Sequence, residues 1–295
     1  MHNVYEEVAS NKFKSGLIIT FFIGFIVGLV YLITYLFNLG NGYIFLALIF
    51  ALISSFASYF WGDKIVLSLN NAHPAPRNLY FNFYTVTENL AMADQIPMPK
   101  IYVIDDPSPN AFATGRDPEH AVVCATTGLL ERLNRTELEG VIAHELSHVK
   151  NYDTRLMMIV SILIGTVSIL INFANQSLWF GRGRDREDRG GGGILMIFGL
   201  ILIIFAPIIA QLIQLAISRR REYLADASAV KLTRQPQGLI DALQKISDDP
   251  SPMESASTAT ASLYIENPFK GNKLASLFST HPPIEDRIRA LQEMM

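Results

Sequence analysis

The stretch His144-Glu145-Leu146-Ser147-His148 has the form HExxH, which is typical of zinc hydrolases when it lies on a helix. Residues four apart lie about one turn from each other on the same helical face, so both imidazoles can reach one metal ion. Glu145 projects toward the same cleft, where it can accept a proton from metal-activated water. The spacing therefore predicts a catalytic metal centre. The alternative is a pair of buried, hydrogen-bonded core histidines.

The residues around this motif predict a helix. Thr136 and Glu139 have the Thr-x-x-Glu spacing of a capping box, in which two side chains bond to free backbone N–H groups at the start of a helix. Apolar side chains then recur at helical spacing, at Leu138, Val141, Ile142 and Leu146. We therefore expect a helix that starts near Thr136 and carries the motif.

The composition indicates a membrane protein. Of the 295 residues, 50% are hydrophobic and only 17% are charged, and the mean hydropathy is +0.26. These values exceed those of an ordinary soluble domain. The formal net charge of −3 argues against nucleic acid as a partner. The single cysteine, Cys124, excludes a disulfide within the chain.

Four apolar segments could enter a bilayer. Residues 16–37 and 43–61 carry no charge and are joined by turn-forming residues, so we expect a transmembrane hairpin. The first run is too long for a cleaved signal peptide. Residues 156–173 and 194–217 form a second candidate pair of borderline length. That length leaves two alternatives, a buried core hairpin and a hairpin that enters the membrane without crossing it.

These segments divide the chain into an N-terminal hairpin (residues 1–62), a first catalytic region with the motif helix (63–155), a second hydrophobic hairpin (156–217) and a second catalytic region (218–295). If the second hairpin goes in and returns, both catalytic regions lie on one side and can form one domain. Lysines and arginines near the segment ends favour the cytoplasmic side. The arginines between the second pair of segments conflict with that rule: Arg182, Arg184, Arg186 and Arg189.

The two polar regions predict an α+β domain with a small sheet. Helical patterns cover residues 78–94, 219–230 and 283–295, and short β-like runs cover residues 100–104, 110–114 and 121–126. Residues 248–272 are rich in Ser, Ala, Thr and Pro and show little periodicity. We expect them to form a mobile loop, and a lid over the cleft is the weaker interpretation.

A catalytic zinc ion needs three protein ligands and one open position, so a third ligand must accompany the two histidines. The extended pattern HExxHxxGxxH fails, because Asn151 and Thr154 replace its glycine and its last histidine. The best acidic candidate is Glu222, which would share a helical face with Asp226. One carboxylate could bind zinc while the other holds a histidine by its distal nitrogen. A solvated helix face is the alternative.

Four features together resemble the HtpX-type membrane zinc proteases, bacterial relatives of the CAAX prenyl endopeptidases, over essentially the whole chain. They are the HELSH core, the Glu222-x-x-x-Asp226 pair after a hydrophobic hairpin, Asn110-Ala111-Phe112-Ala113, and His281-Pro282-Pro283. The resemblance implies that His144, His148 and Glu222 bind one zinc ion per chain. It also implies that Glu145 is the general base and that Asp226 supports a ligand.

The same resemblance suggests roles for further residues. Asn110 to Ala113 would be an edge strand that lines the substrate groove, where an extended peptide adds as a β-strand. His281 would stabilise the developing oxyanion, and Arg287 would lie near the glutamate ligand. Asp153 could orient a ligand or cap the end of the motif helix. For Asn110 to Ala113 a plain hairpin edge is the alternative, and for His281 a rigid turn.

Together these features predict an α-helical integral membrane protein with a zincin-like α+β catalytic domain. We expect a multi-pass protein of the bacterial inner membrane that cleaves misfolded or damaged membrane proteins at the cytoplasmic face. Its partners would be polypeptide substrates and the lipid bilayer. Four apolar segments cannot enclose a large chamber, so prenylated peptides are poor candidate substrates. The alternatives are a non-proteolytic, chaperone-like protein with structural zinc and a zinc hydrolase that acts on other bonds.

Overall fold

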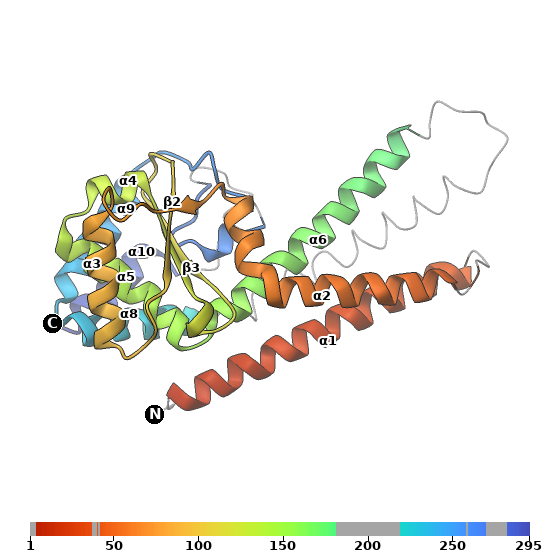
Figure 1. The fold of residues 1–295 in the computed structure, drawn as a ribbon, viewed down its shortest axis with the longest axis horizontal. Coiled ribbons are helices and arrows are strands. Elements are labelled where there is room, and N and C mark those ends of the chain that lie inside the picture. The colour runs from red at the N-terminus through yellow and green to blue at the C-terminus, as the bar shows by residue number, and fades with distance from the viewer. Residues whose placement is uncertain (1–3, 37–39, 41, 181–218, 258, 270–281) are drawn as a thin grey trace.

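The computed structural model describes residues 4–36, 40, 42–180, 219–257, 259–269 and 282–295. Two long helices, α1 (Val4–Leu36) and α2 (Gly42–Leu69), lie side by side and extend away from a rounded domain that holds most of the other elements (Figure 1). A third long helix, α6 (Asp153–Phe180), leaves the same end of the domain at an angle to them (Figure 1).

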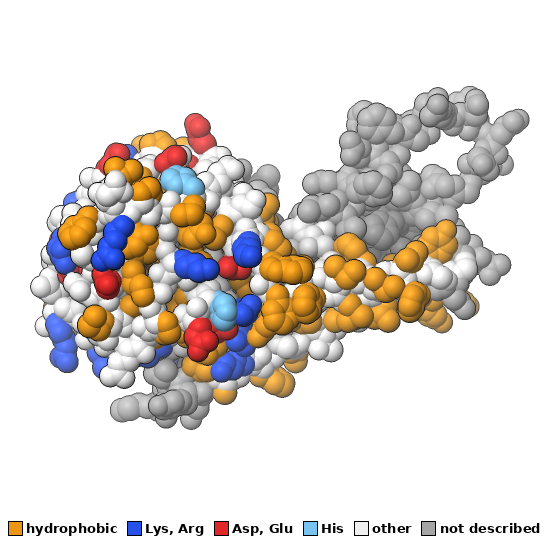
Figure 2. Space-filling model, viewed as in Figure 1, with side chains coloured by type: hydrophobic (Ala, Val, Ile, Leu, Met, Phe, Trp, Pro, Cys, Tyr) orange, Lys and Arg blue, Asp and Glu red, His pale blue; other side chains and the backbone are white. Residues whose placement is uncertain are grey.

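The first two helices form the hairpin that the sequence predicts. Within the described residues, the segments Val8–Leu32 and Gly42–Leu69 are long and apolar enough to cross a bilayer, with mean hydropathies of 2.3 and 2.0. Only 18% and 22% of their apolar windows are buried. Figure 2 shows apolar side chains along the face of this arm. An outward-facing apolar surface of this length suits contact with lipid.

The helix α6 contains the third apolar segment, residues 156–173, but its first turns belong to the domain core. Leu156, Met158 and Ile159 are fully buried there. Met158 also packs so closely against α2 that a Cβ added at Gly62 would lie 2.7 Å from its sulfur. The start of this segment is therefore buried in protein, while the alternative of a core hairpin for the whole pair stays a prediction. The fourth segment, residues 194–217, lies outside the described residues.

The domain contains a four-stranded mixed sheet. Its order is β1 (His73–Pro74), β2 (Lys100–Ile104), β4 (Val122–Thr126) and β3 (Ala111–Thr114). Strands β2 and β4 are parallel, whereas β1–β2 and β3–β4 are antiparallel. The three β-like runs are thus confirmed to within one residue. Strand β3 lies at the edge of the sheet.

Helices surround the motif helix, α5 (Arg135–Lys150). It packs against α3 (Phe81–Ala93), α8 (Arg219–Thr233) and α9 (Pro236–Asp248), and α10 (Ile284–Gln292) lies against α8 and α9. The backbones of α5 and α9 approach very closely, since a Cβ added at Gly140 would lie 2.8 Å from the Leu239 Cα. Contacts of this kind hold α5 rigidly in the core, which suits a helix that positions reactive groups.

The capping box of α5 is not the one predicted. Asn134 is the N-cap: its Oδ1 accepts from the Glu137 N–H at 3.0 Å, and Glu137 Oε2 accepts from the Asn134 N–H at 2.8 Å. The prediction of Thr136 with Glu139 is therefore wrong by two residues. Both pairs have the same spacing, and Glu139 instead pairs with Arg135 on the helix surface. In the capping box that forms, Glu137 also contacts Lys245 of α9 at 2.7 Å.

The described part of residues 248–272 is mostly irregular, as the composition predicts for a loop, and it is joined to other elements by hydrogen bonds. Its mobility stays a prediction. Thr260 and Tyr264 are fully buried, and both donate hydrogen bonds to Asn70 Oδ1 at the end of α2, at 2.8 and 3.1 Å. Asp106 accepts from the Glu254 and Ser255 N–H groups nearby. The segment contains a short 3-10 turn at Ala261–Leu263, and its partners Asn70 and Asp106 lie far away in the sequence.

Candidate metal centre

Three buried side chains converge between α5 and α8. His144 and His148 project from successive turns of α5, and Glu222 projects from the first turn of α8. The two Nε2 atoms lie 3.2 Å apart. Glu222 Oε2 lies 3.6 Å from His144 Nε2, and Glu222 Oε1 lies 3.6 Å from His148 Nε2. One ligand atom from each residue can therefore face a common point, and these atoms lie within 4.8 Å of one another.

This donor set fits a zinc ion. With bonds of about 2.0–2.2 Å and tetrahedral angles, two ligand atoms of zinc lie about 3.3–3.6 Å apart. The two Nε2 atoms lie 3.2 Å apart, and each lies 3.6 Å from a different oxygen of Glu222, so the separations are close to that geometry. Two imidazoles and one carboxylate also leave the fourth position open for water or substrate, as in catalytic zinc sites.

Each histidine is held by its other ring nitrogen. Asp226 Oδ1 lies 2.9 Å from His144 Nδ1, and Asp153 Oδ2 lies 3.0 Å from His148 Nδ1. A carboxylate at Nδ1 keeps the proton there and leaves the Nε2 lone pair directed into the cluster. The structure thus places Asp153 on a histidine, whereas Asn151 is the C-cap of α5.

Arg287 of α10 closes the cluster from the other side. Its side chain is 0% exposed and donates from Nε and Nη2 to the two carboxylate oxygens of Asp226, at 2.9 and 2.6 Å. Burial alone would raise the pKa of Asp226, but the Arg287 charge lowers it, to about 2. Arg287 Nη1 also lies 3.9 Å from Glu222 Oε2. The arginine therefore keeps the Asp226 carboxylate ionised, and Asp226 holds His144.

The role of Arg287 predicts a large effect of Arg287→Met. The change leaves Asp226 and Glu222 buried without their cation, so we expect a loss of about 3–5 kcal/mol in the free energy of unfolding. Thermal unfolding of the detergent-solubilised protein measures this loss. Arg289→Met is the matched control on the same helix, because Arg289 is 72% exposed and its contact with Asp286 is long, at 3.7 Å. Equal stability of the two variants would contradict the role of Arg287.

The proposed general base lies beside these ligands. Glu145 is 2% exposed on α5, between the two histidines in sequence, and its charge is among those that raise the pKa of Arg287. His281, the proposed oxyanion stabiliser, lies outside the described residues. Pro282, which follows it, is buried.

The predicted substrate strand is an edge strand, but part of its edge is covered. All residues from Asn110 to Ala113 are buried. The Ile265 N–H donates to the Ala111 carbonyl at 2.9 Å, and the Asn110 side chain donates to the Glu266 carbonyl at 2.9 Å. The chain around Ile265 thus lies along the outer edge of β3 at Ala111.

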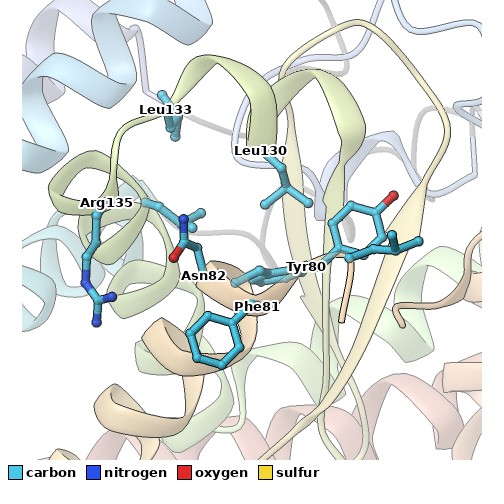
Figure 3. Close-up of a pocket in the computed structure, with 9 residues that line it drawn as sticks. Tyr80, Phe81, Asn82, Leu130, Leu133 and Arg135 are labelled. Carbon is cyan, nitrogen blue, oxygen red and sulfur yellow. The ribbon is translucent and has the colours of Figure 1, made fainter. Parts of the chain in front are cut away.

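A separate hollow of about 370 Å³ lies away from this cluster. Figure 3 shows Tyr80 and Phe81 at the start of α3 on one side of it and Leu130 and Leu133 on the other. None of the predicted ligand, base or substrate residues lines this hollow. It is therefore distinct from the metal cluster.

The structure also brings in one polar residue that sequence reasoning missed. Asn11, near the start of α1, is 0% exposed and donates to Asp153 Oδ1 at 2.7 Å. In the sequence it is one of several polar residues that precede the first apolar run, so nothing singles it out. Asp153 is more than a hundred positions away, so no local pattern connects them.

Comparison with known proteins places this chain in a family. The model of peptidase family M48 matches residues 82–295. A "Protease HtpX homolog" of Ligilactobacillus salivarius is 46% identical over 297 residues, which cover 99% of this chain and 100% of that protein. A protein of the same name from Streptococcus uberis is 45% identical over 301 residues, with the same coverage.

Among solved structures, the crystal structure of Ste24p from S. mikatae is similar to this chain, with a TM-score of 0.49 and 22% sequence identity. The match covers 94% of this chain, which spans 65% of the length of Ste24p. The family match over residues 82–295 and the full-length matches to HtpX homologues agree with the HELSH motif and the buried cluster of His144, His148 and Glu222. This chain therefore belongs to peptidase family M48 and is a metalloprotease of the HtpX type.

Proposed function

We propose that this metalloprotease is a zinc-dependent endopeptidase that cleaves misfolded or damaged membrane proteins at the cytoplasmic face of the bacterial inner membrane. The observation that supports this proposal best is the buried cluster of His144, His148 and Glu222 next to Glu145. A structural zinc site has no need of a carboxylate beside its ligands. The cluster also lies close to the root of an apolar hairpin, because Asn11 of α1 contacts the residue that holds His148.

The residues have distinct tasks in peptide hydrolysis. Zinc held by His144, His148 and Glu222 would supply Lewis-acid polarisation of the scissile carbonyl and of a water molecule. Glu145 accepts a proton from the attacking water and delivers it to the leaving amine. His281 donates a hydrogen bond to the developing oxyanion. Asp226 and Asp153 hold the two imidazoles in the orientation that binding requires.

Substrate recognition would depend on the backbone. An extended polypeptide can add to the outer edge of β3, where main-chain hydrogen bonds provide affinity with little dependence on sequence. At this edge the Ala111 carbonyl already accepts a hydrogen bond from the Ile265 N–H. Because Thr114 is also 0% exposed, a substrate would have to displace the chain at Ile265. Backbone pairing suits a protease that acts on many unfolded polypeptides.

Metal removal tests this function. The full chain, purified in detergent, is expected to contain about one zinc ion per molecule, as one three-ligand site requires. It should cleave an unfolded model protein, lose this activity on chelation and regain it when zinc is restored. Zinc at that level without any cleavage would contradict the proposal and favour the chaperone-like alternative. Cleavage that survives complete zinc removal would contradict the metal mechanism.

A further inference from the structure

A buried polar network connects the first helix of the hairpin to a proposed zinc ligand. We call it the α1 network, and it consists of Asn11, Asp153, Arg221 and His148. All four side chains are buried, and they come from α1, the start of α6, the first turn of α8 and α5. These elements are far apart in the sequence. Asn11 lies in the polar start of α1, before its apolar run, yet it is 0% exposed. Burying a polar side chain costs free energy unless its hydrogen bonds are satisfied, so its burial needs an explanation.

Every hydrogen-bonding group of the Asn11 amide is used. Its Nδ2 donates to Asp153 Oδ1 at 2.7 Å and to the Asn151 carbonyl at 2.9 Å. Its Oδ1 accepts from Arg221 Nη1 at 3.3 Å. With the amide reversed, Oδ1 would face the Asp153 carboxylate and the Asn151 carbonyl, and the NH2 group would face the Arg221 guanidinium. Neither contact could be a hydrogen bond. The surroundings therefore accept one orientation, and only an uncharged amide of this size satisfies both sides.

The network continues directly to the metal cluster. Asp153 Oδ1 accepts one hydrogen bond from Asn11 Nδ2 and another from Arg221 Nη1, the latter at 3.2 Å. The other oxygen, Oδ2, contacts His148 Nδ1 at 3.0 Å. Because two donors from different helices hold Oδ1, the carboxylate plane is fixed, and the direction of Oδ2 is fixed with it. The orientation of His148 therefore depends on where α1 lies.

A second contact holds the same turn of α1. Lys12 Nζ lies 4.2 Å from the centre of the Tyr152 ring. Tyr152 lies between Asn151 and Asp153 in the sequence. Tyr152 has a positive φ of 60°, so the backbone between α5 and α6 turns sharply there. The start of α1 thus contacts the α5–α6 turn through two neighbouring side chains, one of which reaches the metal cluster.

We propose that Asn11 is a positioning residue for the metal site, which acts on His148 through Asp153, so that docking of the first membrane helix completes the zinc centre. This inference rests on the proposed zinc-binding role of His148. It gives the hairpin a second task besides membrane attachment. A chain whose α1 has not docked would hold zinc more weakly and would be a poorer protease.

The test is zinc affinity, measured by chelator competition on the full chain in detergent. Asn11→Ala is expected to weaken zinc binding about 10-fold, at the lower end of the 10–100-fold loss seen when a group that supports a metal ligand is removed. The matched control is Ser15→Ala, one turn later on α1. Ser15 is also buried, but its hydroxyl donates to the Asn11 carbonyl of its own helix. We expect Ser15→Ala to leave zinc affinity unchanged.

A double-mutant cycle separates positioning from general stability. If Asn11 acts through Asp153, Asn11→Ala has no further effect on zinc affinity in an Asp153→Ala background. Additive losses would overturn the proposal, as would a lower melting temperature of Asn11→Ala with unchanged zinc affinity. If Asn11→Ala fails to accumulate, Asn11→Ser takes its place, because serine is too short to reach all three partners.

The outcome also distinguishes this inference from the proposed function. A wild-type chain that binds zinc but cleaves nothing would overturn the protease proposal, while the zinc measurements on Asn11 would still decide the inference. A wild-type chain that binds no zinc would overturn both. Retained zinc affinity in Asn11→Ala together with full proteolysis in the wild type would overturn the inference alone.

Discussion

Glu145→Gln is expected to retain its zinc and to lose roughly 10²–10⁴-fold in kcat, the usual contribution of a positioned acid–base group. Glutamine has the same size as glutamate, so the 2% exposed site should keep its packing. The amide cannot accept a proton from the attacking water at neutral pH. Zinc content and cleavage of an unfolded protein, measured side by side on wild type and variant, check both parts of the prediction.

The control for this change is Glu139→Gln on the same helix. Glu139 pairs with Arg135 at the surface of α5, away from the cluster, so that variant should cleave like the wild type. Wild-type activity in Glu145→Gln would place the base elsewhere and contradict the mechanism. Loss of zinc from Glu145→Gln would show that the carboxylate supports the site and would leave its role as base without support.

Local patterns predicted much of the fold. The β-like runs at residues 100–104, 110–114 and 121–126 correspond to β2, β3 and β4. They were recognisable because each short run of strand-forming residues is bounded by residues that break strands. The hairpin was predictable from its uncharged length. Periodicity could not separate α6 into a core part and a projecting part, because burial in protein and burial in lipid select the same apolar side chains.

The segment 248–272 shows what local reasoning cannot reveal: the contacts that a loop makes with other elements. Its Ser, Thr and Ala content is typical of a loop, and nothing nearby contradicts that interpretation. Within its described residues, Asn70 and Asp106 bond to it from other parts of the chain. Such partners are set by the tertiary fold. The N-cap of α5 is a similar case, because Lys245 of α9 contacts the N3 residue, Glu137.

The candidate site was predictable to the extent that one helix encodes it. His144, Glu145 and His148 follow from spacing alone. Glu222, on another helix, was the best acidic candidate from the sequence, but the sequence left a solvated helix face as the alternative. Arg287 was proposed only through family resemblance. The structure brings Glu222 and Arg287 to the histidines. Asn11 could not be proposed by either route, since its partners meet it only after α1 packs on the domain.

Glu222→Ala is expected to lower zinc affinity by more than about 100-fold, beyond the range for groups that only support a ligand. The variant removes one of three donors, and two histidines alone hold zinc weakly. It also leaves the Arg287 guanidinium with less negative charge nearby, since Arg287 Nη1 lies 3.9 Å from Glu222 Oε2. An excess cation beside the open ligand position would further oppose a divalent ion. Chelator competition on the purified chain measures the loss.

Asp226→Asn on the same helix is the informative comparison, because it lies one turn from Glu222 and contacts His144 at Nδ1. If Glu222 is the ligand, Asp226→Asn should weaken zinc binding by only about 10–100-fold. Unchanged zinc content in Glu222→Ala would move the third ligand to Asp226, Asp153 or His281. Of these, Asp226 and Asp153 already hold the Nδ1 atoms of the histidines. Either could bind zinc only by releasing the Nδ1 atom of its histidine, so the site would lose that hydrogen bond as well as Glu222.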